Sequence, residues 1–159
     1  MGLLAMLALG CKTNAIKIDP PKGKLVCFSY TRQGTIAQPY EDYELKLLDN
    51  GTAQLYAHNL GKTHDTVSVS PDVVKTVQEM IISNEIYKYE KDYRPPFEVM
   101  DGESWRYSAE YDDGTSLSSG GFNARPNNFA LPLIVSMLDS IAVKAGAQNK
   151  GFTEDWYSL

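Results

Sequence analysis

The sequence predicts an α+β domain in which an antiparallel sheet of about five to six strands carries two helices on one face. Two observations predict the sheet: residues alternate between apolar and polar on both sides of a glycine turn at 43–57 and again at 105–117. A third predicts the helices, because apolar residues recur at helical spacing in 73–81 and 134–142. The expected order is strand, hairpin, strand, helix, hairpin, helix.

Length and charge restrict the class of protein. With 159 residues, 43% of them hydrophobic, the chain is expected to form a single domain. The net charge of -5 argues against nucleic acid as a partner, because phosphate binding needs clustered Lys and Arg, and here these residues are scattered among acids.

Residues 1–10 carry no charge and are expected to be the end of a signal peptide. As a helix the stretch from Gly2 to Gly10 would span about 14 Å, roughly half of a bilayer core, so it is too short for a transmembrane anchor. Leu7-Ala8-Leu9-Gly10-Cys11 resembles a bacterial lipobox, in which Cys11 is acylated and becomes the mature N-terminus. Leu9 is larger than the small residue that usually lies two positions before the lipobox cysteine. No positively charged segment precedes the apolar run, which is what a sequence would show if its start lay downstream of the true start of the protein. An ordinary apolar N-terminus is the alternative.

The rest of the chain divides into a tether at 11–24 with Pro20-Pro21, a domain at 25–146 and an aromatic tail at 147–159 that docks on the sheet or binds a partner. Strands are expected at 25–30 and 65–69. In the first hairpin a three-residue loop at 49–51 places Leu47 opposite Ala53 and Leu45 opposite Leu55.

The first helix is expected to start at Ser70-Pro71-Asp72 and to end near 83–84, with Ser70 as cap. In the second hairpin a three-residue loop at 112–114 sets Leu117 opposite Ala109. Gly120 and Gly121 are then expected to turn the chain toward the last helix, which Asn127 or Asn128 caps and Gly146 ends. The apolar stripes are Val73, Val77, Met80 and Ile81 in the first helix, and Ile134, Met137, Leu138, Ile141 and Ala142 in the last.

Few groupings point to chemistry. His58, His64 and Asp65 match no standard zinc spacing, Ser118 lacks a nucleophile-elbow frame, and Cys27 fits a small buried hydrophobe, so we expect no metal and no cofactor. Arg125 beside the glycine pair either holds an anion or is a solvated loop charge. The acids that could form a catalytic carboxylate pair are Glu98, Asp101, Glu103 and Glu110.

The segment 86–100 is rich in tyrosine, follows neither strand nor helix period, and contains Pro95-Pro96. A long aromatic loop of this kind is a candidate binding edge. The alternative is that its tyrosines cover the open end of the core.

Residues 101–126 resemble a set of uncharacterised lipoproteins and secreted proteins of Bacteroidetes-type bacteria. The shared pattern is Asp101-Gly102, Trp105, Tyr111-Asp112-Asp113-Gly114 and Ser118-Ser119-Gly120-Gly121-Phe122-Asn123-Ala124-Arg125-Pro126, followed by an apolar helix. The resemblance spans roughly 43–142 and implies the α+β fold and an envelope location, with no known activity.

We therefore expect a non-enzymatic protein anchored by Cys11 to the cell envelope, as an outer-membrane lipoprotein that binds a protein or glycan partner. The alternative is a small secreted hydrolase that uses two of the four acids named above. A purely structural domain is the third possibility. The candidate binding residues are Tyr87, Tyr89, Tyr93, Trp105, Arg106 and Arg125.

Overall fold

The structure, a computed structural model, describes residues 18–34, 41–59 and 63–148. Within these ranges one seven-stranded sheet has the order β4-β3-β2-β1-β6-β7-β5, and it is antiparallel except for the β5 and β7 pair. The elements are β1 (Leu25–Gln33), β2 (Glu41–Leu47), β3 (Ala53–Asn59), β4 (Thr63–Val69), α1 (Asp72–Ser83), the 3-10 turn η1 (Ile86–Lys88), β5 (Asp92–Tyr93), β6 (Ser104–Tyr111), β7 (Ser116–Phe122) and α2 (Leu131–Lys144).

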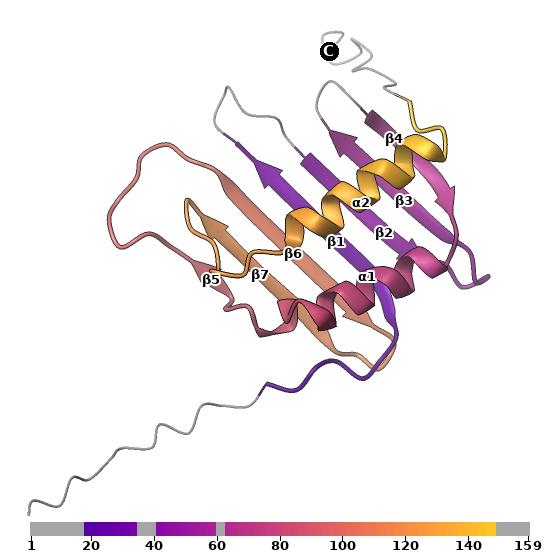
Figure 1. The fold of residues 1–159 in the computed structure, drawn as a ribbon, viewed down its shortest axis with the longest axis horizontal. Helices are drawn as coiled ribbons and strands as arrows, with labels where there is room; N and C mark the ends of the chain where they lie inside the picture. Colours follow the sequence, from indigo (N-terminus) through magenta and orange to yellow (C-terminus); the bar gives the residue numbers. More distant parts are fainter. Residues whose placement is uncertain (1–17, 35–40, 60–62, 149–159) are drawn as a thin grey trace, which may run out of the picture.

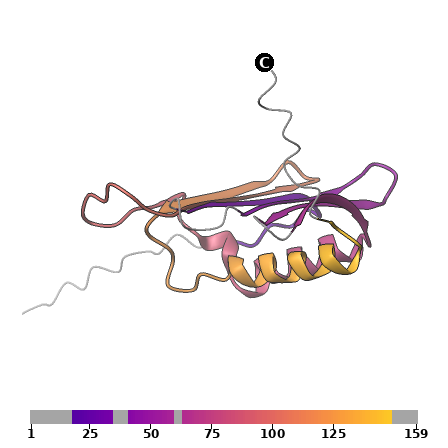
Figure 2. The ribbon, with the colours of Figure 1, turned by 90° about the horizontal axis from the view of Figure 1, so that it is seen from above.

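Both helices pack on one face of this sheet, and no described element covers the other (Figures 1 and 2). The predicted α+β class is confirmed, with one or two strands more than expected. The core lies between sheet and helices. It includes Phe28, Tyr43, Leu55, Tyr107, Val77, Ile81, Ile134 and Leu138, which are almost fully buried.

The register of both hairpins is confirmed. Leu45 pairs with Leu55 in the first hairpin, and Ala109 pairs with Leu117 in the second. Gly51 and Gly114 have φ angles of +79° and +84°, the left-handed conformation that a three-residue loop requires at its last position. The turns fix the register, and the register decides which side chains share a face.

The first helix begins and ends where it was expected, but the prediction that Ser70 caps it is wrong, because the residue before its first turn is Pro71 and no side chain caps it. The backbone N–H of Asp72 donates to Ser70 Oγ at 3.2 Å, and the helix ends at Ser83. The buried valines are Val74 and Val77, while the predicted Val73 is half-buried. Val77 and Ile81 of the predicted stripe are confirmed as buried, and Val73 and Met80 are partly buried against the core.

The start of the last helix was predicted wrongly. Its first residue is Leu131 with Ala130 before it, and neither Asn127 nor Asn128 caps it. The anchor at this end is Tyr89, whose hydroxyl accepts from the backbone N–H of Ala130 at 2.8 Å and donates to the carbonyl of Asn128 at 2.7 Å. Tyr89, which is 41 positions away from Ala130 in the chain, therefore forms the hydrogen bonds that were expected from a capping residue next to the helix.

The strand β5 was not predicted, and it corrects the role of the glycine pair. Gly120 and Gly121 lie within β7 and pair with Asp92 and Tyr93, so they do not form the turn toward α2. That turn is made by Asn123, which has a φ of +51°.

Several hydrogen bonds hold the two ends of the described domain. The side chain of Gln78 bonds both the backbone N–H of Leu25 and the carbonyl of Gly23, each at 2.9 Å. At the β4 edge the N–H of His64 donates to the carbonyl of Gln148.

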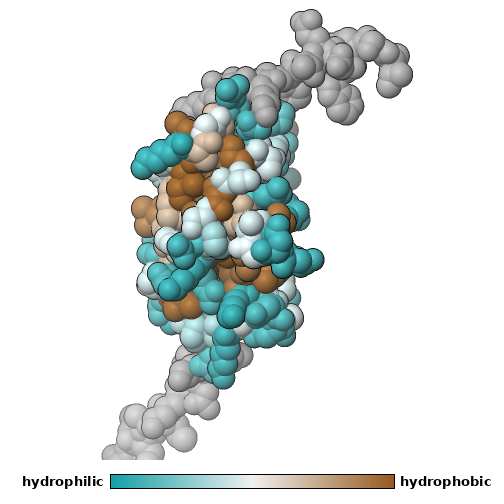
Figure 3. All heavy atoms as spheres, turned by 90° about the vertical axis from the view of Figure 1, so that its right-hand side faces the viewer, coloured by the Kyte–Doolittle hydropathy of each residue, from teal (hydrophilic) through white to brown (hydrophobic). Residues whose placement is uncertain are grey.

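Seen from the right-hand side of Figure 1, hydrophobic residues are interspersed with hydrophilic ones (Figure 3). Among the described residues, no helix is both long and apolar enough to cross a membrane.

Candidate functional site

A groove crosses the uncovered face of the sheet, and the strand register builds it. Thr31 of β1, Arg106 of β6 and Gly120 of β7 lie opposite one another in a row. In the next row Gln33, Ser104 and Phe122 are opposite one another. Because residues two apart on a strand point to the same face, these two rows form one surface.

Gly120 makes the groove hollow. Gly120 has no side chain and lies beside Arg106, and a Cβ added to Gly120 would be 3.0 Å from the carbonyl oxygen of Trp105. Lys91, Asp92 and Arg94 close the groove on the β5 side. Its volume is about 580 Å³, within the usual range for small-molecule sites.

The charge of the groove differs in sign from that of the chain. It contains Lys91, Arg94 and Arg106 against a single acid, Asp92, in a chain whose net charge is -5. Arg94 already has partners, because its Nε donates to a carboxylate oxygen of Asp92 at 2.8 Å and its guanidinium lies 5.9 Å from the centre of the Phe122 ring. The exposed Arg106 side chain makes no hydrogen bond or ion pair within the described ranges.

Hydroxyl groups continue the polar surface from the groove along the sheet. Ser29, Ser108 and Ser118 form the next row across β1, β6 and β7, and the hydroxyls of Ser29 and Ser108 are 2.8 Å apart. Each hydroxyl can both donate and accept a hydrogen bond. The face therefore offers a cation and several adaptable hydroxyls.

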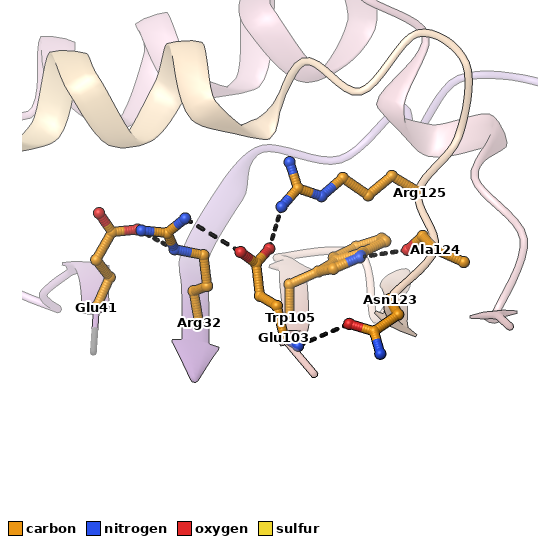
Figure 4. A network of polar contacts seen from close by, with 7 residues as sticks. All are labelled: Arg32, Glu41, Glu103, Trp105, Asn123, Ala124 and Arg125. Carbon is orange, nitrogen blue, oxygen red and sulfur yellow. Dashed lines mark hydrogen bonds and ion pairs between the residues drawn. The ribbon is translucent and has the colours of Figure 1, made fainter. Parts of the chain in front are cut away.

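On the helix side of the sheet, Glu103 joins two arginines. Glu103 lies between the guanidinium groups of Arg32 and Arg125 (Figure 4). Arg32 is also 2.9 Å from Glu41 through its Nε. Arg125 is thus an exposed loop charge that pairs with Glu103, and it does not form a cradle with the glycine pair, which lies within β7.

Most of the predicted aromatic binding residues pack against the core. Trp105 is only 3% exposed, and its indole N–H donates to the carbonyl of Ala124 at 2.8 Å (Figure 4). Tyr87, Tyr89 and Tyr93 are half-buried against the core, with Tyr89 edge-on to both Tyr93 and Tyr107. A contact surface that includes Trp105 is therefore wrong, and the tyrosines close the end of the core.

The four candidate acids do not gather in a cleft. Asp101 and Glu103 line one hollow, but Glu103 is held by its two arginines. Glu110 lies near the other end of β6, about 23 Å from Glu103 at the rise of a strand. Glu98 is exposed on the loop before β6.

The two histidines meet across β3 and β4, although their spacing in the sequence suggested nothing. His58 is opposite His64, with ring centres 4.8 Å apart, and opposite Asp42 on its other side. Burial, followed by the neighbouring His64, lowers the pKa of His58, while Asp42 opposes this shift. No group of three or more metal-ligating side chains occurs in the part of the chain that the structure describes.

The lowered pKa of His58 predicts that acid destabilises the protein. Its pKa is below the unfolded value near 6.5, so the unfolded chain binds the additional proton, and stability falls as pH drops through 6.5 toward the folded pKa. This one proton contributes at most about 1.4 kcal/mol per pH unit. Urea unfolding at pH 7.5 and 5.5 measures the loss. His58→Asn should lose less stability over this interval, and an equal loss in both proteins contradicts the assignment.

Cys27 is not in the core as expected. It pairs with Lys46 and Glu110, the neighbours of the core residues Leu45 and Ala109, so it lies on the uncovered face. Its thiol is half-buried, and burial raises its pKa. Such a thiol is a poor nucleophile at neutral pH.

Fold and groove together define the class of this protein: an α+β domain with a polar, locally cationic sheet face. Neither a family model nor a curated protein matches the chain. Of the features expected from the sequence, Cys11 and the tail residues Trp156 and Tyr157 lie outside the described residues. The groove residues Thr31, Gln33, Lys91 and Arg94 were missed, although strand parity places Thr31 and Gln33 with Ser29 on one face.

Proposed function

We propose that this protein is a non-enzymatic binding module of the bacterial cell envelope whose ligand is an acidic glycan. The observation that carries the proposal is the cationic groove on the uncovered sheet face, with Arg106 unpaired among the described residues. The envelope location rests on the lipobox-like residues 7–11 and on the resemblance of residues 101–126 to envelope lipoproteins.

The chemistry of the groove favours a sugar over a protein. Protein interfaces bind mainly through buried aromatic and apolar anchors, whereas Thr31, Ser104 and Ser118 supply hydroxyls and Gln33 an amide. Hydroxyls and amides match the hydroxyl groups of a glycan. The excess of cations selects a glycan that carries carboxylates, because an arginine fork binds a carboxylate through two hydrogen bonds.

The proposal predicts that Arg106→Gln weakens binding to an oligogalacturonate by about tenfold or more, since a charge-assisted pair contributes at least about 1.4 kcal/mol. Calorimetric titration of the 159-residue chain measures this. The methyl-esterified oligosaccharide, which has the same sugars without the charge, should bind as weakly to the wild type as the acidic one binds to Arg106→Gln.

Lys46→Gln is the matched control, because Lys46 is a cation on the same face, outside the groove and paired with Glu44. It should bind like the wild type. Equal loss in both variants would mean that general surface charge attracts the ligand. Equal binding of polyglutamate would show that no sugar is recognised. Either result, or no binding of the acidic oligosaccharide, contradicts the proposal.

A further inference from the structure

A second hollow lies on the opposite side of the sheet, between the ends of β1, β2 and β3 and the first turns of α2. Its volume is about 270 Å³, slightly below the usual range for drug-sized ligands. Arg125 and Phe129 form one end, and Asp139 lies farther along α2. Nothing in the glycan proposal uses this site.

Tyr30 points to a ligand here. It is 2% exposed and lines the hollow, yet its hydroxyl makes no hydrogen bond with any residue in the described ranges. The hydroxyl is not among the fully enclosed polar atoms of the described residues, so it reaches the hollow and can bond a molecule that lies there. Burial, followed by the charge of Glu41, raises the pKa of Tyr30, so its hydroxyl keeps its proton and can donate.

Asp139 supplies a negative charge at one end. Its Oδ1 accepts from the hydroxyl of Tyr43 at 3.1 Å, and the side chain of Asn59 hydrogen-bonds that same hydroxyl. These partners orient the carboxylate without neutralising it. In the described part of the chain, no Lys or Arg forms an ion pair with Asp139.

Arg125 supplies a positive charge at the other end. Its guanidinium lies 5.1 Å from the centre of the Phe129 ring, and only its Nη2 bonds Glu103 (Figure 4). The other donors of its guanidinium fork remain for a ligand. Glu103 thereby holds the arginine in position without using all of it.

The extent of the hollow along α2 limits the length of the ligand. Pro132, Val135 and Asp139 lie on one face of α2, and seven residues of helix span about 10 Å. A dipeptide is about 7 Å long, or about 13 Å with a charge-assisted hydrogen bond at each end. A single amino acid is shorter by about 3.5 Å.

The geometry points to a binding site for a short zwitterionic peptide, the size of a dipeptide, between α2 and the sheet. Its ammonium group meets Asp139, its carboxylate meets Arg125, and an acceptor on it takes the hydrogen bond from Tyr30. Phe129, Pro132 and Val135 provide an apolar wall for one of its side chains.

Three forms of one dipeptide test this. Leucyl-glycine, its N-acetyl form and its C-terminal amide are titrated by calorimetry against the 159-residue chain. We expect the N-acetyl form and the amide each to bind at least about tenfold more weakly than the free dipeptide. Equal binding of all three, or no binding of the free dipeptide at about 10 mM, overturns the proposal.

The variants assign the two ends. Asp139→Asn should no longer discriminate against the N-acetyl form, and Arg125→Gln should no longer discriminate against the amide. Tyr30→Phe should weaken binding of the free dipeptide several-fold. If circular dichroism shows that Asp139→Asn does not fold, Tyr30→Phe is the variant that tests the site. Unchanged discrimination in the folded variants refutes the site.

Two controls separate this site from the groove. Glu79→Gln removes an exposed carboxylate of α1 outside the hollow and should bind the dipeptide as the wild type does. Arg106→Gln should also leave dipeptide binding unchanged, because Arg106 lies on the opposite face of the sheet. If it abolishes binding of both ligands, the separate dipeptide site is wrong.

Discussion

Gly121→Ala is expected to destabilise the protein by about 3 kcal/mol, the upper part of the range for overpacking a filled site. A Cβ at this position would be 2.4 Å from the carbonyl oxygen of Ala124 and 2.6 Å from Nε1 of Trp105. These two atoms bond each other at 2.8 Å, so neither can move away without breaking that bond. The free energy of unfolding in urea measures the effect.

Gly114→Ala is the matched control for this substitution. Gly114 has a φ of +84°, but an added Cβ would meet nothing within 4 Å. Only the left-handed backbone then opposes the alanine, for about 1 kcal/mol. If Gly121→Ala is no more destabilising than Gly114→Ala, the close approach of Trp105 and Ala124 to Gly121 does not limit stability.

Trp105→Ala is expected to destabilise the protein by about 3 to 5 kcal/mol, the usual effect of removing a large buried aromatic. The centre of the indole ring lies 4.8 Å from the centre of the Phe129 ring and 5.9 Å from the centre of the Tyr93 ring. It therefore joins the sheet to the segment leading into α2 and to β5. Chemical unfolding followed by circular dichroism measures the loss.

Trp105→Phe separates the two contributions of this side chain. Phenylalanine keeps an aromatic ring in the core but leaves the carbonyl of Ala124 without the indole N–H, for about 1 to 2 kcal/mol. A loss in Trp105→Ala below about 1 kcal/mol would contradict the buried position of the ring. An equal loss in the two variants would assign the whole effect to the hydrogen bond.

The hairpins could be predicted from the sequence because their determinants are local. Asn50-Gly51 and Asp113-Gly114 select the loop, and the loop sets the pairs Leu45 with Leu55 and Ala109 with Leu117. Likewise Ser70 and Pro71 mark the start of α1 within three residues of chain. Each feature depends on backbone preferences that neighbouring residues express without tertiary contacts.

The two-residue strand β5 could not be predicted in this way. It exists because Asp92 and Tyr93 reach the edge of β7, where the N–H of Gly120 also bonds the carbonyl of Lys91. The start of α2 likewise depends on Tyr89, which is distant in the chain. Neither contact leaves a periodic pattern in the sequence.

The candidate site residues likewise fall into those that the sequence could identify and those that only the tertiary structure revealed. Arg106 was identified from the sequence because its charge had no structural explanation, and the structure places it in the groove. Trp105 was selected for its residue type, which does not distinguish a surface anchor from a core residue. The partners of Arg106 in the groove come from β1, β5 and β7, and only strand order brings them together.

The sequence by itself determined the fold class, both hairpin registers and the bounds of α1, since all of these follow from local periodicity and turn chemistry. Only the tertiary structure decided which residues share a surface. The segment 105–129, whose tryptophan, acids, serines and glycines together suggested one site, is divided by the sheet. Trp105 faces the core, Arg106 the groove, and Arg125 the hollow beside α2. The reason is physical: adjacent residues of a strand point to opposite faces.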